Sequence, residues 1–330
     1  MQKAAPFLLR TIKRYWRKVG SGLIFFIYVF ISSVALVLYG PYENVRSTVI
    51  GAVLTSRHPW YAEYFYTPAA LAKYKPVTMD KVSEGSMKIN NFSAVHDNGI
   101  QVIPLSTKKY NGSLLVVKDP KRLHITVTKH INNVGQTVSQ MVKEDSAVAG
   151  LNAGGFYDVK GKGTGGIPMG ITISHGKYIT GSTDGKQPVI GLTDAGALIV
   201  GKYSYQDLMT LKVKEAISFG PQLVKDGTPY LTDRDGSWGV APRSVIGQRK
   251  DGAILLLAIS GRGKNGVGAS LLDCQKIMLD NGAVIAANLD GGYSTELYYK
   301  NEFLVPPSNP LGERYVATAF IVDRSIDHAD

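Results

Sequence analysis

The chain has 330 residues, of which 44% are apolar and 36 are glycine, a composition typical of a globular protein with a packed core and many loops. The net charge of +11 is unevenly distributed along the chain, because six basic residues and no acidic residue precede position 40. The rest of the chain contains 31 basic and 26 acidic residues. This excess of positive charge is too small to indicate a nucleic-acid partner. The single cysteine, Cys274, excludes an intramolecular disulfide and a cysteine-type metal site, and its apolar setting in SLLDCQKIML favours burial.

The N-terminal segment predicts a membrane anchor. Residues 1–19 form a basic tail and residues 20–39 carry no charge, which is long enough to span a bilayer as one helix. Because basic flanks stay in the cytoplasm, we expect a single-pass signal anchor in the cell membrane, with the N-terminus cytoplasmic and the C-terminal domain extracellular. A cleavable signal peptide is the main alternative, since SVA at 33–35 has small residues at suitable positions. Both alternatives place the rest of the chain outside the cytoplasm.

Two regions follow this anchor. Residues 40–84 have helical spacing and then an aromatic-rich stretch between prolines, which predicts a juxtamembrane stalk. Over 85–330, short β-rich runs are separated by Gly, Asn and Asp turns, and 269–283 has helical periodicity. The predicted fold class is therefore α+β: a single mixed domain over 85–330 with mixed β-sheets and a few packed helices, preceded by one transmembrane helix.

Two G-x-G-x-x-G matches raise the alternative of a dinucleotide site. The first, at 161–166, is followed closely by a proline, which favours a loop. The second, Gly261 to Gly266, lies between a predicted strand and a predicted helix, as in a dinucleotide fold. We disfavour it because VGAS separates its third glycine from the helical rhythm. It still predicts that Arg262 and Asp290 lie at the carboxyl ends of neighbouring strands, where open sheets bind ligands.

Five polar, glycine-rich clusters follow one another: GLNAGGFYD at 150–158, SFGPQLVKDG at 218–227, APRSVIG at 241–247, SGRG at 260–263 and NLDGGYST at 288–295. Their order resembles the phosphodiester glycosidase family, and the resemblance extends from 152 to 322. It implies a hydrolase that acts on sugar-1-phosphodiester linkages. It also implies a catalytic role for Asp290 and substrate-binding roles for Asn152, Gly154, Gly155, Arg243, Arg262, Asn288, Gly291, Gly292, Ser294 and Thr295.

The chemistry of these residues suits that substrate. Arg243 and Arg262 can clamp a phosphate bidentately, and paired glycines let backbone N–H groups approach an anion. Phosphate is a good leaving group, so charge stabilisation as the C1–O bond breaks matters more than a strong general acid. Asp290 is the predicted carboxylate that activates water or stabilises the oxocarbenium-like centre, with Glu296 or Asp158 as the second carboxylate.

No organic cofactor is predicted, and the ligands of a metal are not identified. Calcium remains an alternative, because Asp158, Asp290 and carbonyl-rich glycine loops offer the oxygen ligands that a hard cation prefers.

The predicted function is a membrane-anchored glycosidase that hydrolyses sugar-1-phosphodiester linkages in surface polysaccharide or cell-wall glycopolymers. Its predicted partners are a carbohydrate phosphodiester substrate and the membrane, through 20–39. Two alternatives stay open. Departures from the family pattern at Ala153, Ser260 and Tyr293 would suit a non-catalytic glycan-binding or scaffolding module on the same fold. A glycosyl-phosphate transferase in exopolysaccharide synthesis would form product only with an acceptor sugar.

Overall fold

The computed structural model describes residues 5–54, 59–74, 79, 81–89, 92, 97–157, 164–232, 238–261 and 266–324. The chain forms two compact units, unit 1 (Met1–Lys75) and unit 2 (Pro76–Asp330).

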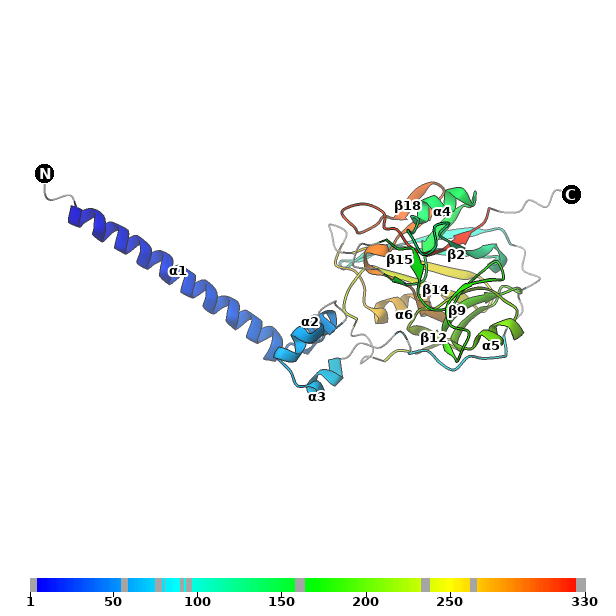
Figure 1. The fold of residues 1–330 in the computed structure, drawn as a ribbon, viewed down its shortest axis with the longest axis horizontal. Helices are drawn as coiled ribbons and strands as arrows, with labels where there is room; N and C mark the ends of the chain where they lie inside the picture. The colour runs from blue at the N-terminus through cyan, green and yellow to red at the C-terminus, as the bar shows by residue number, and fades with distance from the viewer. Residues whose placement is uncertain are drawn as a thin grey trace. The chain divides into compact units, whose positions relative to one another are not determined.

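Unit 1 is helical, and its first helix is compatible with a signal anchor. Within α1 (Ala5–Tyr39), the 22 residues Lys18–Tyr39 have a mean hydropathy of 2.4, and at about 1.5 Å per residue they can cross a bilayer core of about 30 Å. A second helix and shorter turns follow α1 (Figure 1). They pack around a small core of Ile50, Ala62, Leu71 and Tyr74. These elements are α2 (Glu43–Leu54), η1 (Pro59–Tyr64), α3 (Pro68–Leu71) and η2 (Ala72–Tyr74).

Unit 2 contains the sheets (Figure 1). A seven-stranded sheet has the order β1-β2-β15-β14-β16-β12-β13, with bounds β1 (Ile100–Ser106), β2 (Asn111–Val117), β12 (Gln222–Lys225), β13 (Thr228–Pro229), β14 (Arg243–Arg249), β15 (Ile254–Ile259) and β16 (Ala283–Asn288). A five-stranded sheet, β10-β9-β11-β7-β8, contains β7 (Thr172–Ser174), β8 (Lys177–Thr180), β9 (Gln187–Thr193), β10 (Leu198–Tyr203) and β11 (Val213–Ile217).

A second five-stranded sheet, β18-β17-β4-β19-β3, contains β3 (Leu123–Val127), β4 (Ala149–Asn152), β17 (Leu297–Tyr299), β18 (Glu302–Val305) and β19 (Thr318–Val322). The short pair β5 (Phe156–Tyr157) and β6 (Ile167–Pro168) lies apart from these sheets.

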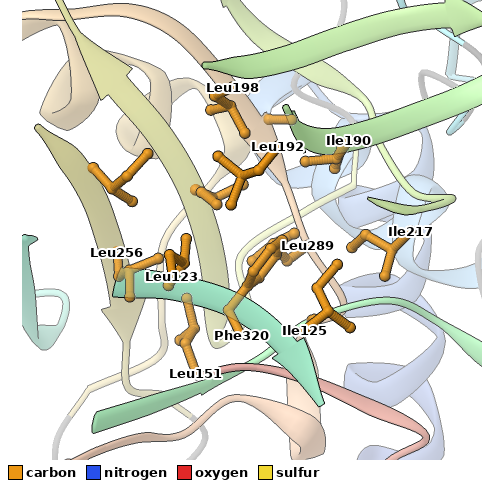
Figure 2. Packing of buried hydrophobic residues seen from close by; sticks show 14 of the residues in the cluster. Leu123, Ile125, Leu151, Ile190, Leu192, Leu198, Ile217, Leu256, Leu289 and Phe320 are labelled. Carbon is orange, nitrogen blue, oxygen red and sulfur yellow. The ribbon is translucent and has the colours of Figure 1, made fainter. Parts of the chain in front are cut away.

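Side chains from the three large sheets meet in one core (Figure 2). Leu256 comes from the seven-stranded sheet, and Ile190 and Phe320 come from the two five-stranded sheets. Along β15 the side chains alternate: Leu256 lies in this core, whereas Leu255 and Leu257 lie in a second buried cluster. A strand that is buried on both faces has a continuous apolar sequence, which is why AILLLAIS predicts β15 correctly.

Each large sheet also packs against a helix. α6 (Leu271–Asp280) covers the second cluster of the seven-stranded sheet, α5 (Tyr205–Thr210) packs on the β9 sheet, and α4 (Val138–Glu144) packs on the β19 sheet. A capping box begins each helix, and in α6 it joins Ser270 and Asp273. Cys274 in α6 is fully buried, as predicted, and burial raises the pKa of its thiol to about 12.

The α+β class is confirmed, but the sheets differ from the mixed sheets that were expected. The named strands pair with one another antiparallel throughout the described residues. An isolated parallel bridge joins Lys202 of β10 to Glu84, which belongs to no named strand. The physical reason is that several successive strands, such as β14 and β15, are joined by short turns, which permit only antiparallel neighbours.

Candidate active site

Among the described residues, Asn288, Asp290 and Arg243 of the predicted set lie where β16 ends and β14 begins. β14 lies between β15 and β16 and is antiparallel to both, so the expectation that β15 and β16 are neighbours is wrong. Their carboxyl ends still meet at one edge, because both strands run opposite to β14. Val245 pairs with Asn288 and Arg243 pairs with Ile259, which brings the start of β14 to the same edge as Asp290.

Asn152 connects three parts of this edge. Its side chain is fully buried at the end of β4. The amide Nδ2 donates to the Asp290 carbonyl at 2.6 Å, and Oδ1 accepts from Ser244 Oγ at 2.6 Å and from the Glu296 N–H at 3.3 Å. The Asp290 N–H also donates to the Ala153 carbonyl at 3.0 Å. Asn152 therefore fixes the backbone on both sides of the Gly291–Gly292 pair.

The Asp290 carboxyl group has an environment suited to proton exchange. The residue is half-buried, and desolvation raises the pKa of its carboxyl group. The Ser294 hydroxyl, the positive charge of Arg314 and the Gly291 N–H act in the opposite direction and favour the ionised form. The net effect still raises the pKa, and a raised pKa brings a carboxyl group closer to the pH at which it can act as an acid or a base.

Arg314 is a charged neighbour of Asp290 that the sequence reasoning missed. Its guanidinium lies 4.8 Å from the centroid of the Phe156 ring, and Arg314 is half-buried. The residue immediately precedes YVATAFIV, a stretch within the family resemblance. The position of Arg314 next to this matched stretch is the signal by which the sequence could have identified it as a site residue.

The paired glycines are required by packing as well as by backbone geometry. A Cβ atom on Gly155 would lie 2.9 Å from both Met169 Sδ and the Phe219 ring, and Gly292 has φ +65°. Three of the four N–H groups act within the protein: Gly154 donates to Thr318 Oγ1 at 3.0 Å, Gly292 donates to the Pro242 carbonyl at 2.9 Å, and the Gly291 N–H acts on the Asp290 carboxyl group. The anion nest that was expected stays a prediction that rests on Gly155.

Arg243 lies at the site, but its guanidinium is engaged with the protein backbone. The side chain is buried, with 4% exposed. Nε donates to the Ala269 carbonyl at 3.2 Å, and Nη2 donates to the carbonyls of Trp238 at 3.2 Å and Gly239 at 2.8 Å. This arrangement braces the loop that leads into β14. The other two charged predictions, Arg262 and Asp158, lie outside the described residues.

Buried polar atoms without a hydrogen-bond partner concentrate near Asp290. Of the seven such side-chain atoms among the described residues, four belong to the stretch 288–296. Three are Asn288 Oδ1, Thr295 Oγ1 and Glu296 Oε2; the fourth, Ser294 Oγ, does not meet the geometry of a hydrogen bond with any group, although it is close enough to act on the Asp290 carboxyl group. Buried polar groups are normally satisfied. Their concentration in η6 (Gly292–Ser294) and its flanks distinguishes this segment from the rest of the described residues, where such atoms are scattered.

Glu296 is buried, and its carboxyl group contacts the start of α4. Its Oε1 accepts from the Val138 N–H at 3.3 Å, at the start of α4. Burial, followed by the charge of Glu313, raises the pKa of Glu296 to about 8, against the effect of the Val138 N–H. In the part of the chain that the structure describes, no hydrogen bond joins the carboxyl groups of Glu296 and Asp290.

A metal site is not evident in the geometry. Among the described residues, no group of three or more His, Cys, Asp or Glu side chains is placed to hold a metal ion. Asp158, one of the two acids of the calcium alternative, is outside those residues.

Comparison with known proteins gives the family. A model of the phosphodiester glycosidase family matches residues 145–323, more than half of the chain. The SPbeta prophage-derived uncharacterized protein YomE of Bacillus subtilis (strain 168) is 26% identical over 205 residues, which are 59% of this chain and 31% of YomE. The chain therefore spans about a third of the length of this curated relative.

Two solved structures share the fold. The catalytic domain of zebrafish N-acetylglucosamine-1-phosphodiester alpha-N-acetylglucosaminidase, auto-inhibited by its pro-peptide, has a TM-score of 0.60 at 20% identity and covers 72% of this chain and 87% of its own. A protein of Burkholderia pseudomallei has a TM-score of 0.52 at 15% identity, with 65% of this chain and 74% of that chain covered. The family match includes the strands that position Asn152, Arg243 and Asp290, and the chain belongs to the phosphodiester glycosidase family.

Proposed function

We propose that this protein is a membrane-anchored hydrolase that cleaves the glycosidic C1–O bond of sugar-1-phosphodiesters outside the cytoplasm. The observation that carries the proposal is the setting of Asp290: a half-buried carboxyl group with a raised pKa, influenced by Ser294 and Arg314, on a backbone that Asn152 holds in place. The zebrafish relative is an N-acetylglucosamine-1-phosphodiester alpha-N-acetylglucosaminidase. We propose the same class of linkage, a sugar-1-phosphodiester, for this protein, without specifying the sugar.

In this proposal Asp290 activates water or stabilises the oxocarbenium-like centre. The oxygen of water forms a bond to C1, the C1–O bond breaks, and the phosphomonoester leaves with the bridging oxygen. The proton released from water passes to a carboxylate, and Asp290 is the candidate whose environment is best described. Because phosphate leaves readily, stabilising charge is the main task of the site.

The anion of the substrate requires positive charge, and we assign this role to Arg314 together with Arg262. Arg314 supplies a charge that acts on Asp290, and arginine binds phosphate oxygens through a planar set of donors. Arg262 comes from the family resemblance. Arg243 is assigned a bracing role, since three of its contacts are backbone carbonyls.

Glu296 is assigned a positioning role rather than a catalytic one. Its carboxyl group holds the start of α4 and its N–H donates to Asn152. Asp158 remains the candidate for a second carboxylate. The proposed polymer, a surface polysaccharide or a wall glycopolymer, follows from the proposed anchor, which would hold the site outside the cytoplasm.

The test compares the full-length chain in nanodiscs with its Asp290→Asn variant on a panel of sugar-1-phosphodiesters. We expect released reducing sugar, and a loss of about 100-fold or more in kcat/KM for the variant. Asp280→Asn is the matched control, because Asp280 is exposed and pairs with Lys276 on α6; its activity should be unchanged.

Two outcomes would contradict the proposal. Product that forms only when an acceptor sugar is added would indicate a transferase. Binding of these substrates without turnover, in a folded chain, would indicate a glycan-binding module.

A further inference from the structure

Unit 1 presents an exposed aromatic patch, formed by Trp60, Tyr61, Tyr64 and Phe65. The exposed fractions of these side chains are 48%, 54%, 76% and 49%. Neighbouring rings lie close together: the ring centroids of Trp60 and Tyr61 are 6.0 Å apart, and those of Tyr61 and Tyr64 are 6.4 Å apart. Large aromatic side chains grouped on a surface usually mark a site of interaction.

The patch is tied to the end of the apolar helix. Tyr39 is the last residue of the stretch that can cross a membrane, and its hydroxyl donates to the Phe65 carbonyl at 3.0 Å. The Tyr66 hydroxyl donates to the Leu38 carbonyl, and the rings of Tyr39 and Tyr66 are 5.7 Å apart. Since a 3₁₀ helix rises about 2 Å per residue, Tyr61 lies along η1 within roughly 8 Å of Phe65. The patch is therefore held where the apolar stretch ends.

The way in which η1 packs against the core of unit 1 explains why these rings are exposed. Ala62, on η1, is buried against Ile50, Leu71 and Tyr74, so that the residues flanking it are directed outward. Glu63 is exposed within the patch, and a carboxylate must remain hydrated. A surface with aromatic rings and a hydrated acid matches the headgroup region of a bilayer, where amphipathic rings concentrate, better than the hydrocarbon core.

We propose that the aromatic patch inserts into the headgroup region of the leaflet at which α1 ends, and that it holds unit 1 against the bilayer surface. The occupant is lipid, because the patch is attached to the end of a helix of membrane-spanning length. This proposal rests on the membrane anchoring proposed above. It adds a second membrane contact to the span itself.

The test measures the depth of a spin label attached to an introduced cysteine in the full-length chain, reconstituted in phosphatidylcholine vesicles. Cys274 is fully buried, so a thiol reagent will label the introduced cysteine selectively. Tyr64→Cys and Tyr61→Cys report the patch, Phe26→Cys reports the span, and Tyr178→Cys is the matched control, an exposed aromatic residue of unit 2. Collision with oxygen and with a water-soluble nickel chelate gives the depth of each label.

We expect the labels at 61 and 64 to lie within about 7 Å of the hydrocarbon boundary, the thickness of the headgroup region. The label at 26 should lie in the hydrocarbon and the label at 178 in water. Labels at 61 and 64 that match the one at 178, while the label at 26 is buried in lipid, would overturn this inference and leave the anchor intact. A water-exposed label at 26 would instead contradict the anchor on which the inference rests.

Discussion

In the proposed mechanism, the chemistry of the site depends on two charges, those of Asp290 and Arg314. The charge of Arg314 lowers the pKa of Asp290, against the effect of burial. Arg314→Gln should therefore raise that pKa and move the acidic limb of the pH profile of kcat/KM to higher pH. It should also raise KM for an anionic substrate by roughly tenfold, the equivalent of one lost charged hydrogen bond. The pH profile separates this role from a merely structural one.

Arg249→Gln is the control for that experiment. Arg249 pairs with Asp251 at the surface, and it is the last residue of β14, whereas the candidate site lies at the first residue, Arg243. Its pH profile should match that of the parent. An unchanged acidic limb in Arg314→Gln would show that Arg314 does not act on the group that titrates in catalysis.

The buried carboxyl group of Glu296 should make stability depend on pH. Burial raises its pKa from the ordinary value of 4.5 to about 8, so the folded state keeps a proton that the unfolded state releases. Stability is unaffected below about pH 4.5 and falls as pH rises towards 8. Glu296→Gln cannot ionise, so its free energy of unfolding relative to the parent should rise across this window by at most about 1.4 kcal/mol per pH unit.

Urea unfolding at pH 5 and pH 8.5 measures this difference for the parent and the Glu296→Gln variant. A stability difference that is the same at both pH values would mean that Glu296 is ionised in the folded protein.

At the level of single residues, the sequence predicted site residues that the structure brings together, but not all of their partners. Asp290, Asn152 and Ser294 were predicted because they lie in glycine-rich stretches with a recognisable order, and the Asn152 amide contacts the Asp290 backbone; their roles in catalysis stay a prediction. Arg314 was missed because its neighbours, Asp290 and Phe156, are distant in sequence. The hydrogen bonds of the Arg243 guanidinium could not be predicted either, because they go to backbone carbonyls. Every residue has a backbone carbonyl, so the sequence does not show which ones Arg243 contacts.

At the level of elements, helix α6 was predicted by its periodicity, and its start can be tested. The Ser270 hydroxyl accepts from the Asp273 N–H at 3.1 Å, and the Asp273 carboxylate accepts from the Ser270 N–H at 2.9 Å. Ser270→Ala should lower the free energy of unfolding by about 1 kcal/mol, whereas Ser270→Gly should cost only a few tenths, as expected for an N-cap. Equal effects of Ala and Gly in urea unfolding would argue against capping as the cause.

The strands were easier to predict than their order. β2, β15 and β16 follow from apolar runs between turn residues, yet nothing in those runs shows that β14 lies between β15 and β16. Local sequence sets which face of a strand is buried, while the choice of neighbour depends on contacts across the whole core. The prediction that Arg262 and Asp290 follow neighbouring strands is therefore wrong about the neighbours, since β14 separates β15 from β16, and Arg262 lies outside the described residues.

At the level of the whole molecule, the site depends on sheet pairings between segments far apart in the chain. β19, near the C-terminus, pairs with β3 and β4, and β17 also pairs with β4. These pairings bring Asn152 to Glu296 and Asp290. Such long-range order explains why the α+β class could be predicted from composition and periodicity, whereas the arrangement of three sheets around one core could not.

The central claim is that water attacks C1 of the sugar rather than phosphorus. Oxygen-isotope labelling of the product tests it most directly. The full-length chain is incubated with a sugar-1-phosphodiester in ¹⁸O-labelled water, and the phosphomonoester product is analysed by mass spectrometry. Cleavage of the C1–O bond leaves the bridging oxygen on phosphorus, so the account predicts a phosphomonoester without ¹⁸O. Incorporation of one ¹⁸O atom into the phosphomonoester would show P–O cleavage and would contradict a glycosidase.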